Sequence, residues 1–203
     1  MLKTVKNRVE HEIVINKSRF IGILIPLDQA EDSDFWLEEI REEYPDASHH
    51  CFAWIYDAKR KVSDDGEPSK TAGLPMLNVL EKQQLDHILA IVVRYFGGIK
   101  LGAGGLVRAY TKAVVNALDN AQIVTKVSAP YYAFRFDYHF IRQIDHLFKN
   151  EDIEIQRKDY QDKVTYECFI LDENLLNVLQ ERFSNQIEMT CLKYADVEIK
   201  GEI

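Results

Sequence analysis

One segment of the chain combines five glycines with four cationic side chains and contains no acidic residue. It lies between Asp86 and Asp119, and its glycines fall within nine consecutive positions. Glycine lets a backbone turn tightly or approach a ligand closely. Backbone N–H groups at the start of a helix, together with nearby cations, bind anions such as phosphate. We therefore predict an anion-binding or nucleic-acid-binding site made of Arg94, Gly97, Gly98, Lys100, Gly102, Gly104, Gly105, Arg108 and Lys112.

The spacing around these glycines limits the kind of site. An apolar, β-branched run over 88–93 predicts a buried strand before them, and apolar residues at three- and four-residue steps predict a helix after Gly105. Arg108 would then lie in the first turn of that helix, where the dipole disfavours a cation unless an anion is bound. The segment has neither GxGxxG nor GK[ST], so dinucleotide and ATP sites are disfavoured. A structural turn with solvated cations is the alternative that the sequence leaves open.

A second set of candidate residues comes from two earlier segments. His49 and Cys51 would share one face of a strand, with His50 on the other, because successive strand residues point to opposite faces. A Cys–His nucleophile pair also needs an orienting group and an oxyanion site, and neither is evident, so structural histidines are favoured. The acidic turn over 64–67 could hold Mg²⁺ or Ca²⁺, but its spacing is not that of an EF-hand loop and a solvated turn is more common. The candidate shared surface is His49, His50, Asp64, Asp65, Glu67, Lys70 and Thr71, and we predict no metal and no cofactor there.

Composition and charge narrow the function classes. The 203 residues carry a formal charge of −8, which divides into −2 for residues 1–128 and −6 for residues 129–203. This balance argues against indiscriminate nucleic-acid binding and predicts no DNA specificity, although a local basic patch stays open. Three cysteines without CxxC spacing argue against a disulfide framework or a zinc site. The absence of a signal-peptide core and of a membrane-length apolar run predicts a cytoplasmic protein.

The elements that must position these residues form two patterns. Before residue 128 we expect two strands within 9–27, a helix over 31–44 with Ser33 at its N-cap, a strand over 49–56 and a polar loop from 58 to 73. A helix, the central strand, the glycine loop and a last helix follow. From Pro130 the order is βαββαβ, which is the ferredoxin-like order. We therefore predict an α+β fold with domains at 1–128 and 129–203.

Four segments, taken together, resemble one family. KSRFIG at 17–22, PDASHHCFAW at 45–54, SDDGEPSKTAGLPML at 63–77 and VVRYFGGIKLGAGGLVRAY at 92–110 resemble the IMPACT/YigZ family. The resemblance implies a ribosomal protein S5 domain 2-like N-terminal domain and a ferredoxin-like C-terminal domain, the pair of folds also found in elongation factor G. Eukaryotic relatives regulate translation through protein competition, using an extra N-terminal domain. The family has no established catalytic residue, so the resemblance assigns none here.

These observations support three hypotheses. The first is a non-enzymatic, translation-associated regulatory protein whose basic glycine segment contacts phosphate of structured RNA or the ribosome. The second is an enzyme that acts on a small anionic substrate, with the histidines and the acidic turn beside the glycine loop. The third is a protein–protein interaction module that binds a regulatory protein. Tyr132 and Phe134 of the second domain could stack bases, but a packing or protein-docking role is favoured because that domain is acidic and lacks the RNP sequences.

Overall fold

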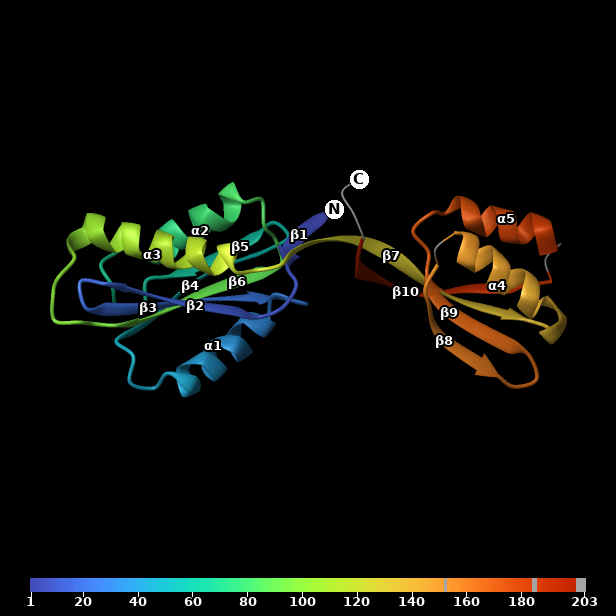
Figure 1. Cartoon of the computed structure of the whole chain (residues 1–203), viewed down its shortest axis with the longest axis horizontal. Helices are drawn as coiled ribbons and strands as arrows, with labels where there is room; N and C mark the ends of the chain where they lie inside the picture. Colours follow the sequence, from blue (N-terminus) through green and yellow to red (C-terminus); the bar gives the residue numbers. More distant parts are fainter. Residues whose placement is uncertain (152, 184–185, 200–203) are drawn as a thin grey trace. The chain divides into compact units, whose positions relative to one another are not determined.

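The computed structural model describes residues 1–151, 153–183 and 186–199 (Figure 1). It divides the chain into two compact units, one formed by Leu2–Thr125 and the other by Met1 with the residues from Lys126 onward. The sequence placed the division at residue 128, and residues 152, 184–185 and 200–203 of the predicted second domain lie outside the described part. None of the helices in the described ranges has both the length and the apolar character needed to span a membrane.

The first unit is a mixed α+β structure built on an antiparallel sheet with the strand order β2-β3-β6-β4-β5. Asn16 and Lys17, both with positive φ, make the predicted tight turn between the first two of these strands. The elements in chain order are β1 (Leu2–Val5), β2 (Val9–Ile15), β3 (Ser18–Pro26), α1 (Asp32–Glu43), β4 (His49–Tyr56), β5 (Lys59–Ser63), α2 (Gly73–Lys82), β6 (Ile88–Tyr95) and α3 (Gly102–Asp119).

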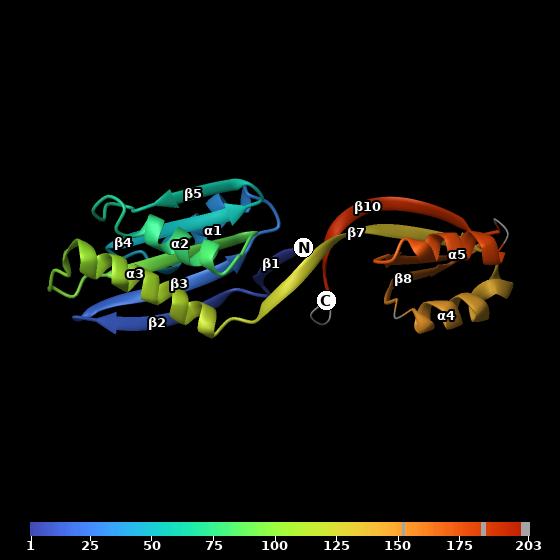
Figure 2. The same ribbon diagram turned by 90° about the horizontal axis from the view of Figure 1, so that it is seen from above.

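Helices cover both faces of this sheet: α2 and α3 lie over one face (Figure 2), and α1 lies on the opposite face (Figure 1). One hydrophobic core joins α2 and α3 to the sheet residues Ala90 and Val92, and a second core joins α1 to Ile91 and Val93. The central strand β6 is therefore buried on both sides. This explains why its sequence is continuously apolar instead of alternating.

Three features of the first unit differ from those expected from the sequence. Ser33 was predicted to cap α1, but the helix begins at Asp32 and Ser33 is buried inside it. The segment expected to be a polar loop contains β5, whose exposed edge position carries polar side chains and therefore gives no alternating pattern. The helix expected after Gly105 begins at Gly102, so Arg108 lies in the second turn and not in the first.

The second unit has the predicted βαββαβ order. Its strands are arranged β10-β7-β9-β8, which is the ferredoxin-like arrangement. Phe134 is fully buried in a core with the two helices, so packing, and not base stacking, is its role. Pro130, expected to start the first strand, lies inside it. The elements are β7 (Ile123–Phe136), the short 3₁₀ helix η1 (Tyr138–Phe140), α4 (Ile141–Asn150), β8 (Ile155–Tyr160), β9 (Val164–Phe169), α5 (Asn174–Phe183) and β10 (Glu188–Glu198).

Candidate functional site

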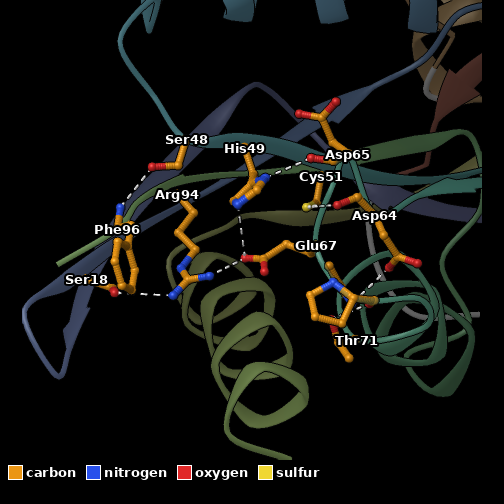
Figure 3. A network of polar contacts seen from close by, with 12 residues as sticks. Ser18, Ser48, His49, Cys51, Asp64, Asp65, Glu67, Thr71, Arg94 and Phe96 are labelled. Carbon is orange, nitrogen blue, oxygen red and sulfur yellow. Dashed lines mark hydrogen bonds and ion pairs between the residues drawn. The ribbon is translucent and has the colours of Figure 1, made fainter. Parts of the chain in front are cut away.

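A buried glutamate lies where the candidate segments of the first unit meet (Figure 3). The side chains of Glu67 and Arg94 are only 4% and 5% exposed, and Arg94 Nη1 donates a hydrogen bond to Glu67 Oε1. The same oxygen accepts a hydrogen bond of 2.8 Å from the hydroxyl of Tyr110, on α3. A carboxylate and a guanidinium can share such an apolar environment because each compensates the charge of the other.

Arg94 also connects this pair to the glycine segment. Its Nη2 lies 3.4 Å from Ser18 Oγ, and that oxygen accepts a hydrogen bond of 3.1 Å from the N–H of Gly97. The Nε atom of Arg94 is buried without a hydrogen-bond partner among the described residues. The guanidinium carbon lies 5.2 Å from the ring centre of Phe20 and 5.5 Å from that of Phe96, so aromatic rings provide part of its environment.

His49 approaches the glutamate from the β4 side. Its Nδ1 is 2.8 Å from the carbonyl oxygen of Asp65, and Nδ1 must carry the proton because a carbonyl can only accept. Its Nε2 is 3.9 Å from Glu67 Oε1. Both ring nitrogens therefore face oxygen atoms of the acidic turn, and the histidine closes the network above Glu67.

The two aspartates of the acidic turn bind backbone N–H groups. Asp64 Oδ1 accepts from Ala72 and Gly73 at the start of α2, at 3.0 and 2.9 Å, and its Oδ2 accepts from the N–H of Lys70 at 2.7 Å. Asp65 Oδ2 accepts from the N–H of His50 at 2.6 Å. Within the described ranges, no three His, Cys, Asp or Glu residues are grouped so that they could hold a metal ion. The turn therefore serves to cap a helix and to fix the loop.

The histidine–cysteine segment divides between the two faces of the sheet, as its alternation predicts. Cys51 Sγ donates to the carbonyl of Asp64 at 3.0 Å and contacts the hydroxyl of Tyr110 at 3.3 Å, on the side of α2 and α3. Burial raises the pKa of the Cys51 thiol to about 12, so the thiolate that a nucleophile needs is not formed at neutral pH. His50 lies on the other side, where Nε2 is 3.1 Å from the carbonyl of Tyr44 and burial lowers its pKa.

The glycines of the predicted anion site have different roles. Gly97 lies so close to the backbone of Lys17 that a Cβ atom would be 2.0 Å from its carbonyl carbon, whereas Cβ atoms on Gly98 and Gly102 would meet open space. Gly102 has a φ of 70° at the first position of α3, a conformation that favours glycine. Gly104 is exposed and Gly105 half-buried within the first turns of that helix.

The four cations of the predicted site separate into two kinds. Arg94 is buried and paired with Glu67, whereas Lys100, Arg108 and Lys112 are exposed and form no ion pair with any residue in the described ranges. Arg108 Nη1 would lie 3.6 Å from a Cβ atom on Gly104, so its guanidinium reaches back over the first turn of α3.

The remaining predicted residues stabilise the loop before α2. Lys70 is exposed, with a positive φ of 64°. Thr71 is buried, and its hydroxyl donates 2.6 Å to the carbonyl of Pro68. The three candidate segments are therefore linked by one chain of polar contacts, which runs from Gly97 through Ser18, Arg94, Glu67 and His49 to Asp65.

Three contributors to this network were not singled out from the sequence. Ser18 and Ser48 bind the backbone N–H groups of Gly97 and Phe96, and Tyr110 binds Glu67. Tyr110 appeared only as one member of the apolar stripe of its helix. A signal was nevertheless present, because a buried tyrosine hydroxyl usually has a hydrogen-bond partner.

The fold and this network coincide with the region shared with known proteins. The family described as the Impact N-terminal domain matches residues 16–118. The chain is 38% identical over 181 residues to the IMPACT family member YvyE of Bacillus subtilis, and the aligned region covers 88% of this chain and 83% of that protein. It is 43% identical over 152 residues to the IMPACT family member YigZ of Escherichia coli, covering 72% of this chain and 74% of the relative.

A solved structure agrees with this similarity over both units. A crystal structure described only as that of a hypothetical protein has 34% sequence identity and a TM-score of 0.65, and the match covers 95% of this chain and 97% of that one. The molecule is thus a two-unit α+β protein with an Impact-type first unit. The chain belongs to the IMPACT family.

Proposed function

We propose that the chain is a non-enzymatic, translation-associated regulatory protein of the cytoplasm, which binds RNA or ribosome phosphate. The glycine loop and the part of α3 from Gly102 to Lys112 would form the binding surface, with Lys100, Arg108 and Lys112 as the cations that meet phosphate. The biological context for this proposal is that eukaryotic relatives in the family regulate translation.

One observation supports the proposal most directly: Arg108, which has no ion-pair partner among the described residues, reaches back over the first turn of a long helix whose N-cap residue makes no side-chain cap. Leu101 precedes α3 and makes no side-chain cap, so the first N–H groups of this 18-residue helix have no side-chain acceptor from that position. The positive end of the helix dipole disfavours the guanidinium of Arg108 unless an anion lies there as well. A phosphate would satisfy both the N–H groups and the guanidinium.

The charge of the whole molecule determines how such a site would behave. A protein of charge −8 repels RNA at long range, so attraction depends on a local patch and on the screening of distant charge. Affinity would then fall steeply with salt, because neutralised phosphates release counterions.

The geometry gives less support to the enzyme hypothesis. The candidate segments do meet, as a shared site would require, but their polar atoms bind one another. Asp64 and Asp65 accept backbone N–H groups, His50 binds a carbonyl, and the thiol of Cys51 stays protonated. An acid–base site needs a group that is free to reach a substrate.

The test is RNA binding by the full chain, measured as fluorescence anisotropy of labelled oligonucleotides over a series of salt concentrations. Removing two phosphate contacts in the variant Arg108→Ala/Lys112→Ala should weaken binding about 25- to 60-fold at roughly 0.1 M salt, because each contact contributes about 0.7–0.9 to the salt slope. The matched control is Arg142→Ala/Lys149→Ala, which removes two exposed cations from α4 and should leave affinity nearly unchanged.

Two results would contradict the proposal. One is that the wild-type chain does not bind RNA even at low salt. The other is that the variant of the α3 pair (Arg108→Ala/Lys112→Ala) and the variant of the α4 pair (Arg142→Ala/Lys149→Ala) lose RNA affinity equally, which would mean that only net charge matters. Capture of a protein partner from lysate after RNase treatment, without any RNA binding, would favour the interaction-module hypothesis instead.

A further inference from the structure

A half-exposed aromatic ring stands directly after the central strand of the first unit. Phe96 is 48% exposed, although it directly follows the buried strand β6. Gly97, the first of the five glycines, comes next in the chain. Its N–H donates to Ser48 Oγ at 3.1 Å, and the next N–H, that of Gly97, donates to Ser18 Oγ at 3.1 Å. Two neighbouring segments therefore fix the backbone that carries this ring.

The ring is also supported from within the site (Figure 3). The guanidinium of Arg94 lies over it, with 5.5 Å between the guanidinium carbon and the ring centre. Arg94 is itself held by its buried ion pair with Glu67. The ring thus contacts a fixed cation, while about half of the residue remains exposed to solvent.

The backbone after the ring cannot move away easily. Gly97 packs against the carbonyl of Lys17 with no room for a Cβ atom, and this close approach holds the start of the loop against the β2–β3 turn. A ring that is already ordered loses little conformational entropy when a ligand stacks on it. The structure therefore presents a rigid aromatic surface at the beginning of the predicted phosphate-binding segment.

We infer that Phe96 stacks on an unpaired base of the RNA, so that the target is single-stranded RNA or a loop and not a continuous duplex; this inference rests on the proposed function. An aromatic ring beside cations is the common means of binding exposed bases. Arg94 beneath the ring draws electron density from it, which favours an electron-rich purine on the open side. Lys100, four residues further along the same loop, is exposed and suited to a flanking phosphate.

The charge of the segment favours a nucleotide over an apolar protein side chain. Between Asp86 and Asp119 there is no carboxylate that would repel phosphate, and the exposed cations there have no ion-pair partner in the described part of the chain. In a duplex the bases are already stacked and paired, so the ring would have no base to receive.

The experiment compares a short single-stranded oligoadenylate with an RNA duplex of the same length, both labelled, on the full chain at low salt. Phe96→Leu keeps an apolar side chain but removes the ring. It should weaken binding to the single strand about 5- to 150-fold, the range for one stacked base, and change binding to the duplex less than about twofold. Phe96→Trp should retain single-strand binding, and its added fluorescence should be quenched when the base stacks.

The matched control is Phe35→Leu. Phe35 is 57% exposed on α1, which packs with the other face of the sheet, so the same change there should alter neither affinity. Thermal unfolding of each variant verifies the fold.

The outcomes separate this inference from the phosphate site. Unchanged single-strand affinity in Phe96→Leu, or equal losses for single strand and duplex, would overturn base stacking even if Arg108→Ala/Lys112→Ala abolishes binding. A loss in Phe96→Leu together with no loss in the α3 pair would overturn the phosphate site and leave stacking supported. Absence of RNA binding by the wild-type chain would overturn both.

Discussion

The buried ion pair between Glu67 and Arg94 should dominate the stability of the first unit around the site. Both side chains are almost fully removed from water, and the pair is joined to Tyr110 through the same carboxylate oxygen. Glu67→Gln preserves the shape of the side chain but removes its charge. The guanidinium of Arg94 would then remain as an uncompensated buried cation.

The expected magnitude follows from these contacts. Breaking a buried ion pair by removal of one partner lowers the free energy of unfolding by about 3–5 kcal/mol. The amide oxygen of glutamine can still accept from Tyr110, so Glu67→Gln should lie near the lower end of that range. Glu67→Ala should lose about 1–3 kcal/mol more, because the buried hydroxyl of Tyr110 also loses its acceptor.

The assay is urea unfolding followed by tryptophan fluorescence. Trp36 and Trp54 are the two tryptophans of the chain and both belong to the first unit, so their emission reports on that unit alone. With a denaturant slope of about 2 kcal/mol per molar, the loss of about 3 kcal/mol expected for Glu67→Gln should lower the midpoint by about 1.5 M.

An exposed ion pair in the same unit provides the control. Arg60 Nε lies 2.7 Å from Glu81 Oε1, but both side chains are more than 40% exposed. Glu81→Gln should therefore change the free energy of unfolding by less than about 1 kcal/mol.

A double variant tests whether the loss arises from the charge. Glu67→Gln combined with Arg94→Met removes both charges, so it should be less destabilised than the sum of the two single variants by about 2 kcal/mol or more. The reasoning is refuted if Glu67→Gln is as stable as Glu81→Gln, or if the two changes at the site are additive.

Two further predictions concern the thiols and the acidic turn. Burial raises the pKa of both Cys51 and Cys168 to about 12, so a thiol reagent at pH 8 should modify only exposed Cys191 in the native chain and all three cysteines in denaturant. The pKa of each thiol is higher in the folded chain than its ordinary value of 9.0, so their contribution to stability is fully present below about pH 9. That contribution should disappear as the pH rises toward 12, because the unfolded chain then gains from ionising its thiols. In Cys51→Ala/Cys168→Ala, the free energy of unfolding should therefore fall less steeply between pH 9 and 12. Asp64→Ala should lower the free energy of unfolding by about 2 kcal/mol through loss of the α2 cap, and Asp64→Asn, which keeps one acceptor, by less than half of that in the same urea assay; equal losses would contradict the capping role.

Much of the fold could be predicted from periodicity. The continuous apolar run of β6, the aromatic-rich run of β4 and the amphipathic helices are local patterns, and each of them matches an element of the structure. The elements that the sequence did not predict, β1 and β5, are short, and the exposed side chains of β5 carry no pattern of burial. The start of α3 was placed too late because glycines resemble a loop when no neighbouring contacts are known.

The candidate site was predicted in part. The sequence singled out Glu67, His49 and Arg94 from three distant segments, and the structure brings all three together. It could not distinguish Arg94 from Arg108, because both are arginines in an acid-free segment. Their difference depends on whether a carboxylate from another segment faces them.

The order of residues by itself determined which segments become strands and helices, where cations gather and where carboxylates are missing, because these are properties of neighbours along the chain. Only the tertiary structure decided which of those charges are buried and paired. Pairing across the sheet and packing of α3 place Arg94 against Glu67, 27 positions apart, and leave Arg108 in water. The free energy of a charge depends on its solvent and its partner, and both are set by contacts that the linear sequence does not contain.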